Sequence, residues 1–192
     1  MPKVNFRRGI FLFLYICSLA MPAFADVSLF GGRLVLPELS GYELYGSNAL
    51  TSSKGTERWS IKEPSKSANK YLLVAPDRKT WVTVFEVKGT SRTKREVEVS
   101  VFDTYFKANL KRQRYEVKKS STISNGTQKI GYYRIAAKQS KGHSAIVLYL
   151  PGKKSSVTQR GYLITVGYPD TESESAKKLA SKIVRGVKVA VK

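Results

Sequence analysis

The sequence predicts an α+β fold in which an antiparallel sheet carries two amphipathic helices. Several segments alternate apolar and polar residues with the period of two that a strand requires, and turn-forming pairs separate them. Two further segments repeat apolar residues every three to four positions, as a helix does. The chain has no internal repeat, and its 192 residues favour a single domain.

The predicted strands are short segments bounded by turn-forming residues. Pro76 and Asp77 favour a hairpin between two of them, and the pair Asn125-Gly126 is a strong hairpin signal for two others. Residues 51–70 are expected to form a loop with one short strand at Trp59-Ser60-Ile61. The remaining predicted strands are 26–37 (centred on 34–36), 41–45, 71–74, 81–87, 115–122, 127–138, 144–150 and 160–168.

The first helix is predicted over about 101–114, after a strand-like alternation of Val97, Val99 and Val101. Ser100 and Asp103 are expected to act as its N-terminal capping pair. The basic stretch of residues 107–119 therefore spans a helix end, up to Arg114, and the beginning of a strand.

The second helix is predicted to open within 170–174, with Thr171 and Glu174 as a capping box. One apolar stripe is expected to face the sheet, while Lys178, Lys182 and Arg185 lie on the opposite side. The stripe consists of Ala176, Leu179, Ala180, Ile183, Val184 and Val187.

The N-terminal residues have the pattern of a cleaved secretory signal. A basic leader precedes an apolar run over residues 10–21, which is short for a bilayer span, and Ala23-Phe24-Ala25 places small residues before the expected cut. We therefore expect residues 1–25 to be a signal peptide, cleaved between Ala25 and Asp26, and residues 26–192 to be the mature domain. In a bacterium this implies a periplasmic location.

The positive charge lies mainly in the second half of the chain. Residues 26–106 hold 12 basic and 10 acidic side chains, a net charge of +2, whereas residues 107–192 hold 19 and 4, a net charge of +15. Between Glu116 and Asp170 the sequence has nine basic residues and no acid. This asymmetry favours an anionic partner, although solvated lysines on a basic protein would give the same count.

The residues for common catalytic and metal chemistry are scarce. Cys17 is the only cysteine and lies in the predicted signal, so no disulfide, cysteine nucleophile or thiolate metal site is expected in the mature chain. His143 is the only histidine, and its surroundings lack the nucleophile-elbow pattern. The carboxylate pair Glu96 and Glu98 more simply solvates an alternating segment. We expect no enzyme activity, no metal and no cofactor.

One short segment begins like an RNA-recognition strand. Arg160-Gly161-Tyr162 matches its first three positions, but Leu163 and Ile164 replace the small and aromatic residues that should follow. With a secretory signal in front, the sequence argues against a nucleic-acid partner. Tyr162 is expected in the core or beside Arg160 on the surface.

The order of these parts resembles the DcrB-like family of bacterial envelope proteins, which have the PsbP-type α/β/α sandwich. Four segments carry the resemblance: VSLFGGRLVLPE at 27–38, GTQKIGYYRIAA at 126–137, HSAIVLYLPGKKSSVTQRGYLITVGYPDT at 143–171 and SAKKLASKIVRGV at 175–187. The resemblance implies a PsbP-like sandwich and an envelope-maintenance or surface role, with links to phage adsorption. It implies no catalytic residue. Family members are often lipoproteins, a feature for which this chain has no convincing motif.

These observations predict a non-catalytic exported envelope protein that binds anionic lipid, lipopolysaccharide or polymer. Peripheral membrane contact would follow, with Tyr132, Tyr133, Tyr149 and Tyr162 adding amphipathic contacts. The alternatives are a protein-interaction or chaperone-like module in envelope assembly or phage adsorption, and an envelope hydrolase. The candidate anion-binding residues are Lys107, Lys111, Arg112, Arg114, Lys118, Lys119, Arg134, Lys138, Lys153, Lys154, Arg160, Lys178, Lys182 and Arg185.

Overall fold

The computed structural model describes most of the residues that follow the predicted signal. The described ranges are 26–47, 70–88, 99–112, 114–126, 128–137, 142–152 and 160–190. The predicted signal peptide, the strand expected around Trp59, and the carboxylates Glu96 and Glu98 lie outside these ranges.

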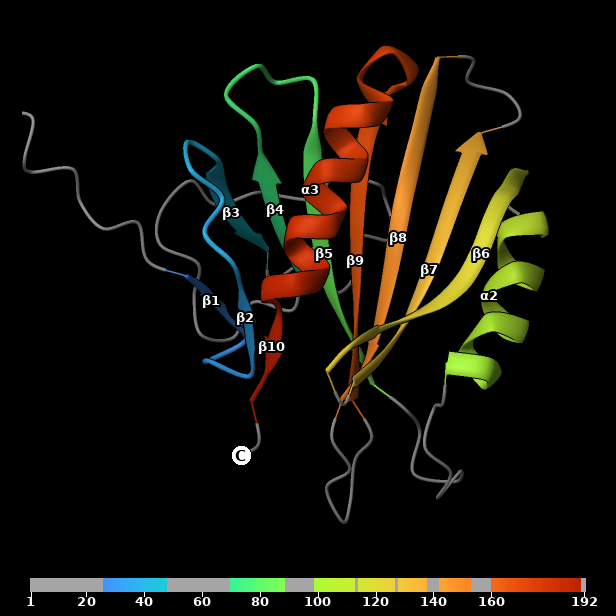
Figure 1. The fold of residues 1–192 in the computed structure, drawn as a ribbon, viewed down its shortest axis with the longest axis horizontal. Coiled ribbons are helices and arrows are strands. Elements are labelled where there is room, and N and C mark those ends of the chain that lie inside the picture. Colours follow the sequence, from blue (N-terminus) through green and yellow to red (C-terminus); the bar gives the residue numbers. More distant parts are fainter. Residues whose placement is uncertain are drawn as a thin grey trace, which may run out of the picture.

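The described residues form two antiparallel sheets, two α-helices and a single 3-10 turn (Figure 1). The large sheet has seven strands in the order β3-β4-β5-β9-β8-β7-β6, and the small sheet has the order β1-β2-β10. The strands of the large sheet are β3 (Glu43–Ser47), β4 (Lys70–Val74), β5 (Trp81–Lys88), β6 (Tyr115–Asn125), β7 (Gln128–Ala137), β8 (His143–Pro151) and β9 (Arg160–Pro169). The other elements are β1 (Val27–Leu29), β2 (Leu34–Leu36), β10 (Lys188–Val189), α2 (Val99–Arg112), η1 (Asp170–Glu172) and α3 (Ser173–Gly186).

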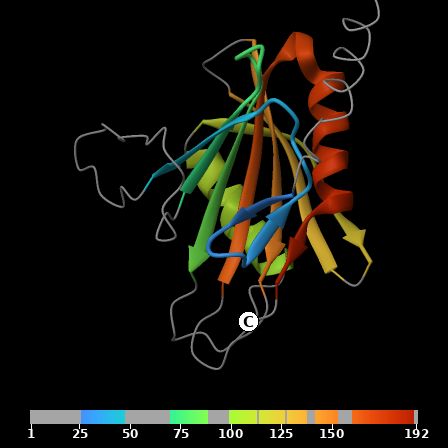
Figure 2. The ribbon, with the colours of Figure 1, turned by 90° about the vertical axis from the view of Figure 1, so that its left-hand side faces the viewer.

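The large sheet lies between the two helices, with α3 on one face and α2 on the other (Figure 2). Strand β8 contributes to both faces, because successive side chains of a strand point to opposite sides of the sheet. Ile146 and Leu148 pack in the core beneath α3, whereas Val147 and Tyr149 pack in the core beneath α2. The small sheet lies on the α3 side, so the fold is the α+β sandwich that the sequence predicts.

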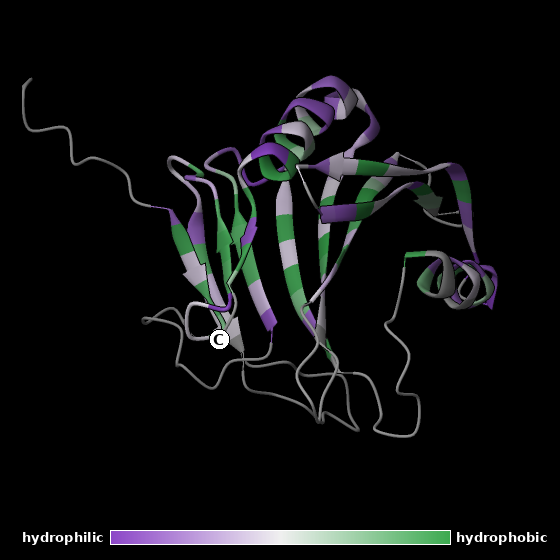
Figure 3. Ribbon diagram, turned by 60° about the horizontal axis from the view of Figure 1, so that its bottom comes forward, coloured by the Kyte–Doolittle hydropathy of each residue, from purple (hydrophilic) through white to green (hydrophobic). Residues whose placement is uncertain are grey.

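The larger core joins α3 and the small sheet to the large sheet. The predicted apolar stripe of α3 is confirmed: Ala176, Ala180 and Ile183 are buried, and hydrophobic colouring of α3 faces the sheet in Figure 3. The alternation predicted for β9 is also confirmed, since Tyr162 and Tyr168 belong to this core. Tyr162 packs against Phe30, which follows β1, with ring centroids 5.4 Å apart.

The smaller core is an aromatic cluster that holds α2 on strands β6, β7 and β8. Phe102 stacks on Tyr149 with ring centroids 3.8 Å apart and planes 4° apart, and Phe106 meets Tyr133 edge-on at 4.9 Å. The ring of Tyr149 crosses β9 at Gly161, where an added Cβ would lie 2.8 Å from the tyrosine hydroxyl. A glycine is therefore required at this crossing.

The first predicted strand is wrong in one respect, because residues 26–37 form a hairpin and not one strand. Val27 pairs with Leu36, and Leu29 pairs with Leu34. Phe30, Gly31 and Gly32 all have positive φ, which folds the chain back, and the Gly32 amide donates to the Leu29 carbonyl at 3.1 Å. Gly31 and Gly32 therefore belong to the turn between β1 and β2.

Both predicted capping arrangements are wrong. Val99 and Ser100 are already helical, so Val99 does not continue a strand and Ser100 is not the N-cap of α2. At the second helix, η1 precedes α3, and the N-cap Glu172 has no side-chain capping hydrogen bond. Both carboxylates assigned to caps bind lysines: Asp103 pairs with Lys107, and Glu174 pairs with Lys177.

The two predicted hairpins are confirmed. The β4–β5 turn is closed by the Ala75 amide, which donates to the Thr80 carbonyl at 2.9 Å, and Asp77 accepts from the Lys79 amide. In the β6–β7 turn, Gly126 has φ of 60°, which a glycine adopts without strain. The end of the first helix and the beginning of the next strand within residues 107–119 are also as predicted.

Candidate anion-binding surface

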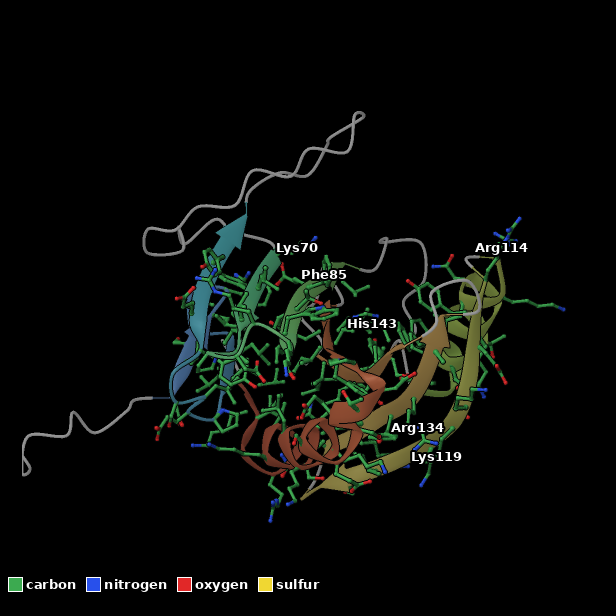
Figure 4. The ribbon with its side chains drawn as sticks, turned by 90° about the horizontal axis from the view of Figure 1, so that it is seen from above. Lys70, Phe85, Arg114, Lys119, Arg134 and His143 are labelled. Carbon is green, nitrogen blue, oxygen red and sulfur yellow. The ribbon has the colours of Figure 1, made fainter. Side chains whose placement is uncertain are left out.

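The predicted cations are divided between the two faces of the large sheet. Those on α2 and just after it are Lys107, Lys111, Arg112 and Arg114. Those on the α3 side are Lys119, Arg134, Lys178, Lys182 and Arg185, while Lys118 lies on the edge strand β6. Figure 4 shows this separation, with Lys119 and Arg134 beside α3 and Arg114 on the opposite side of the sheet.

Four of the candidate cations lack described side chains. Lys138, Lys153 and Lys154 lie outside the described ranges, and the backbone of Arg160 begins β9. The structure therefore places ten of the fourteen candidate side chains, five of them on the α3 side of the sheet.

Strand register places Lys119 and Arg134 on the α3 side. In an antiparallel pair, directly opposite residues point to the same face. Lys119 is opposite Arg134, and Arg134 is opposite Ile146, which is buried in the core beneath α3. Lys119 is exposed and Arg134 is half-buried, and the two side chains lie next to each other in Figure 4.

A β-bulge occurs at this point of β6. Val117 is opposite Ile135 and Lys119 is opposite Arg134, so Lys118 is the extra residue between two regular pairs. Bulges re-aim side chains and occur often beside functional sites. Lys118 itself pairs with Glu116 at 2.8 Å.

The acidic end of α3 adjoins these cations. The Nζ of Lys177 lies 2.5 Å from a Glu174 carboxylate oxygen, and this contact lowers the pKa of Glu174, with smaller contributions from Lys178 and Arg134. Burial raises the pKa of Tyr132, while Arg134 and Lys177 oppose the rise. Lys177 and Tyr132 are therefore neighbours of the Lys119–Arg134 pair.

We refer to Lys119, Tyr132, Arg134, Lys177 and Lys178 together as the α3-side basic surface. Lys177 was not among the residues predicted from the sequence. Its spacing of three from Glu174 signals an ion pair on a helix, but nothing in that spacing shows that β7 lies beside it. Only the packing of α3 on the sheet brings Lys177 near Arg134.

The predicted amphipathic role of three tyrosines is wrong. Tyr133, Tyr149 and Tyr162 are 1–2% exposed and belong to the two cores. Burial is the main cause that raises the pKa of Tyr133, and it raises the pKa of Tyr149 to about 12. Of the four tyrosines, only Tyr132 is accessible beside the cations.

The catalytic alternative has no geometric support around the single histidine. Ser144 donates to the Asp170 carboxylate at 2.5 Å, but adjacent residues of a strand point to opposite faces, so His143 is directed away from this pair. The His143 ring instead lies 6.4 Å from the Trp81 ring. Among the described residues, no group of three or more potential ligands could hold a metal ion.

The burial of Tyr162 also removes the base-stacking surface that an RNA-recognition strand needs, because its ring packs against Phe30 inside the core.

Within the described parts of the chain, neither α2 nor α3 has the length and hydropathy needed to cross a bilayer.

Comparison with solved structures places this arrangement in a known fold class. LpqN of Mycobacterium tuberculosis, described as involved in cell envelope biogenesis, is similar with a TM-score of 0.57 and 12% identity, over 82% of this chain and 83% of that one. Cyanobacterial PsbP (CyanoP) of Synechocystis is similar with a TM-score of 0.53 and 9% identity, over 86% of this chain and 92% of that one.

The chain therefore has the PsbP-type fold that the sequence resemblance implied. No family model matches the chain, and no curated protein matches it in sequence. At these identities the structural likeness establishes the fold alone. Membership of the narrower DcrB-like family stays an expectation from the sequence.

Proposed function

We propose that this chain is a non-catalytic, exported protein of the bacterial cell envelope that binds anionic envelope material. The observation that carries the proposal is the α3-side basic surface, where Lys119 and Arg134 lie opposite each other on neighbouring strands. The net charge of +15 in residues 107–192 supplies long-range attraction toward the same kind of partner.

The envelope setting rests on two independent supports. The sequence resembles DcrB-like envelope proteins, and the similar structure of LpqN belongs to a protein described as acting in cell envelope biogenesis.

Co-sedimentation of the mature chain (26–192) with vesicles tests the proposal. We expect binding to phosphatidylcholine vesicles that contain phosphatidylglycerol, little binding to pure phosphatidylcholine, and a marked loss of binding as salt is raised. The reason is that each basic residue near an anionic surface contributes about 1 kcal/mol, which salt screens. Equal binding to both vesicle types, or binding that salt does not reduce, would contradict the proposal.

One observation favours a protein partner as a second candidate. Strand β6 has 11 residues and ends the large sheet, so its outer edge has no partner strand among the described residues. Such an edge can accept an extended segment of another protein. Capture of an envelope protein that persists at high salt, together with absent vesicle binding, would favour this candidate over anionic lipid.

A further inference from the structure

We propose that the cross-strand pair Lys119–Arg134 is the main phosphate contact through which the α3 side of the molecule docks onto an anionic phospholipid surface. This inference rests on the proposed function and adds to it one face, one pair of residues and one class of ligand. The alternative face, with Lys111 and Arg112 at the end of α2, is then not the docking face.

The pair sets two like charges opposite each other, and no carboxylate forms an ion pair with either of them among the described residues. Like charges directly opposite each other on neighbouring strands destabilise a sheet. Glu174 is close enough to Arg134 for the arginine to lower its pKa, but its ion pair is with Lys177, and Glu116 pairs with Lys118. A phosphate between the two cations would remove their mutual repulsion.

The bulge in β6 sets the register that places Lys119 opposite Arg134. Lys118 is the extra residue beside the Lys119–Arg134 pair and itself pairs with Glu116. Arg134 brings a planar guanidinium, which can donate two parallel hydrogen bonds to one phosphate. Lys119 brings a compact ammonium on a flexible stem, so the two can bind neighbouring oxygens.

The surroundings of the pair suit a membrane surface more than a single small anion. Lys119 is exposed and Arg134 is half-buried, so an isolated phosphate there would stay largely in water. The exposed face of α3 adds Lys178, Lys182 and Arg185 on the same side of the sheet. Many weak contacts over a broad face require an array of phosphates, which a bilayer of anionic lipid presents.

Tyr132 supports the same choice. It is half-buried on β7, two residues from Arg134, and packs at the border of the core beneath α3. A tyrosine with an apolar ring and a polar hydroxyl suits the boundary between headgroups and acyl chains.

Two matched double variants test the assignment. Lys119→Ala with Arg134→Ala removes two positive charges from the α3 side, and Lys111→Ala with Arg112→Ala removes two from the α2 side. Binding of each variant to phosphatidylglycerol-containing vesicles is measured by co-sedimentation. We expect the first variant to lose about tenfold or more in vesicle partitioning and the second about threefold or less, since both share the same net charge.

The outcomes separate the inference from the proposed function. If both variants lose binding equally, net charge alone drives recruitment, and the inference is overturned while the proposed function stands. If the wild-type chain binds no anionic vesicle, the proposed function fails first. The Lys119/Arg134 variant could also lose binding to inorganic polyphosphate but keep vesicle binding. In that case the pair binds a soluble polymer, and the membrane assignment is overturned.

A conservative variant guards against loss of folding. Arg134→Lys keeps the charge and removes the planar fork, so we expect a loss of vesicle binding smaller than that of the double variant. Circular dichroism and thermal unfolding of every variant should match the wild type. A wild-type level of binding in a folded Lys119/Arg134 double variant would overturn the inference outright.

Discussion

The hydroxyl group of Tyr149 lies in the aromatic cluster beneath α2, where burial raises its pKa from 10.0 to about 12. The folded chain therefore holds this proton more tightly than the unfolded chain does. The contribution to stability is fully present below pH 10 and is lost as the pH rises from about 10 toward 12. Alkaline pH should thus act on α2 through a residue far from the α3-side basic surface.

We predict that Tyr149→Phe reduces the fall in unfolding free energy between pH 9 and pH 12, because phenylalanine has no proton to lose. Urea unfolding of both proteins across this pH range measures the difference. Tyr115→Phe, at an exposed tyrosine, provides the matched control and should leave the pH profile of the wild type unchanged. Parallel profiles for Tyr149→Phe and the wild type would contradict the prediction.

At the scale of elements, the two helices are attached to the sheet in different ways. Helix α3 places small and branched residues, Ala176, Ala180 and Ile183, on the sheet. Helix α2 relies on Phe102 and Phe106, which interlock with two tyrosines of the sheet. Losing one ring of α2 removes a large share of its contact area.

We predict that Phe102→Ala, at a half-buried ring, destabilises the chain by up to about 3 kcal/mol and acts first on α2. Native-state hydrogen exchange should show faster exchange of the α2 amides, while the amides of α3 keep most of their protection. Asn109→Ala, at an exposed position of the same helix, is the control. Equal loss of protection in both helices would show that they unfold together.

The sequence identified elements better than it identified their ends. The stripe of α3 and the alternation of β9 were predictable, because each repeats over many residues. The caps at Ser100 and Thr171 were not, because a capping residue needs a chain that is still extended before it. At α3 the 3-10 turn η1 occupies that position, so Glu174 binds Lys177 instead.

At the scale of the whole molecule, the two ends of the described chain lie close together. Strand β1 starts at Val27, and Asp26 lies 3.6 Å from Lys188 near the other end of the described chain. Both ends of the described chain thus meet at the small sheet.

We predict that a bacterial host exports the chain and removes residues 1–25. Intact-mass measurement of the exported protein should give Asp26 as the first residue, because Ala23 and Ala25 supply the small side chains that the cleavage site needs. Replacing Ala25 with phenylalanine should block the cut and leave the precursor uncleaved. A wild-type product that retains residue 1 would rule out the predicted cut.

The sequence by itself determined the classes of the elements, the two faces of α3, and the excess of positive charge after residue 106. These follow from periodicity and composition, which are local properties. Only the tertiary structure decided that the cations of α2 and those of α3 lie on opposite sides of the sheet, and that a bulge sets Lys119 opposite Arg134. A periodic pattern assigns a side chain to a face of its own element, whereas strand order, register and helix placement decide which of those faces meet.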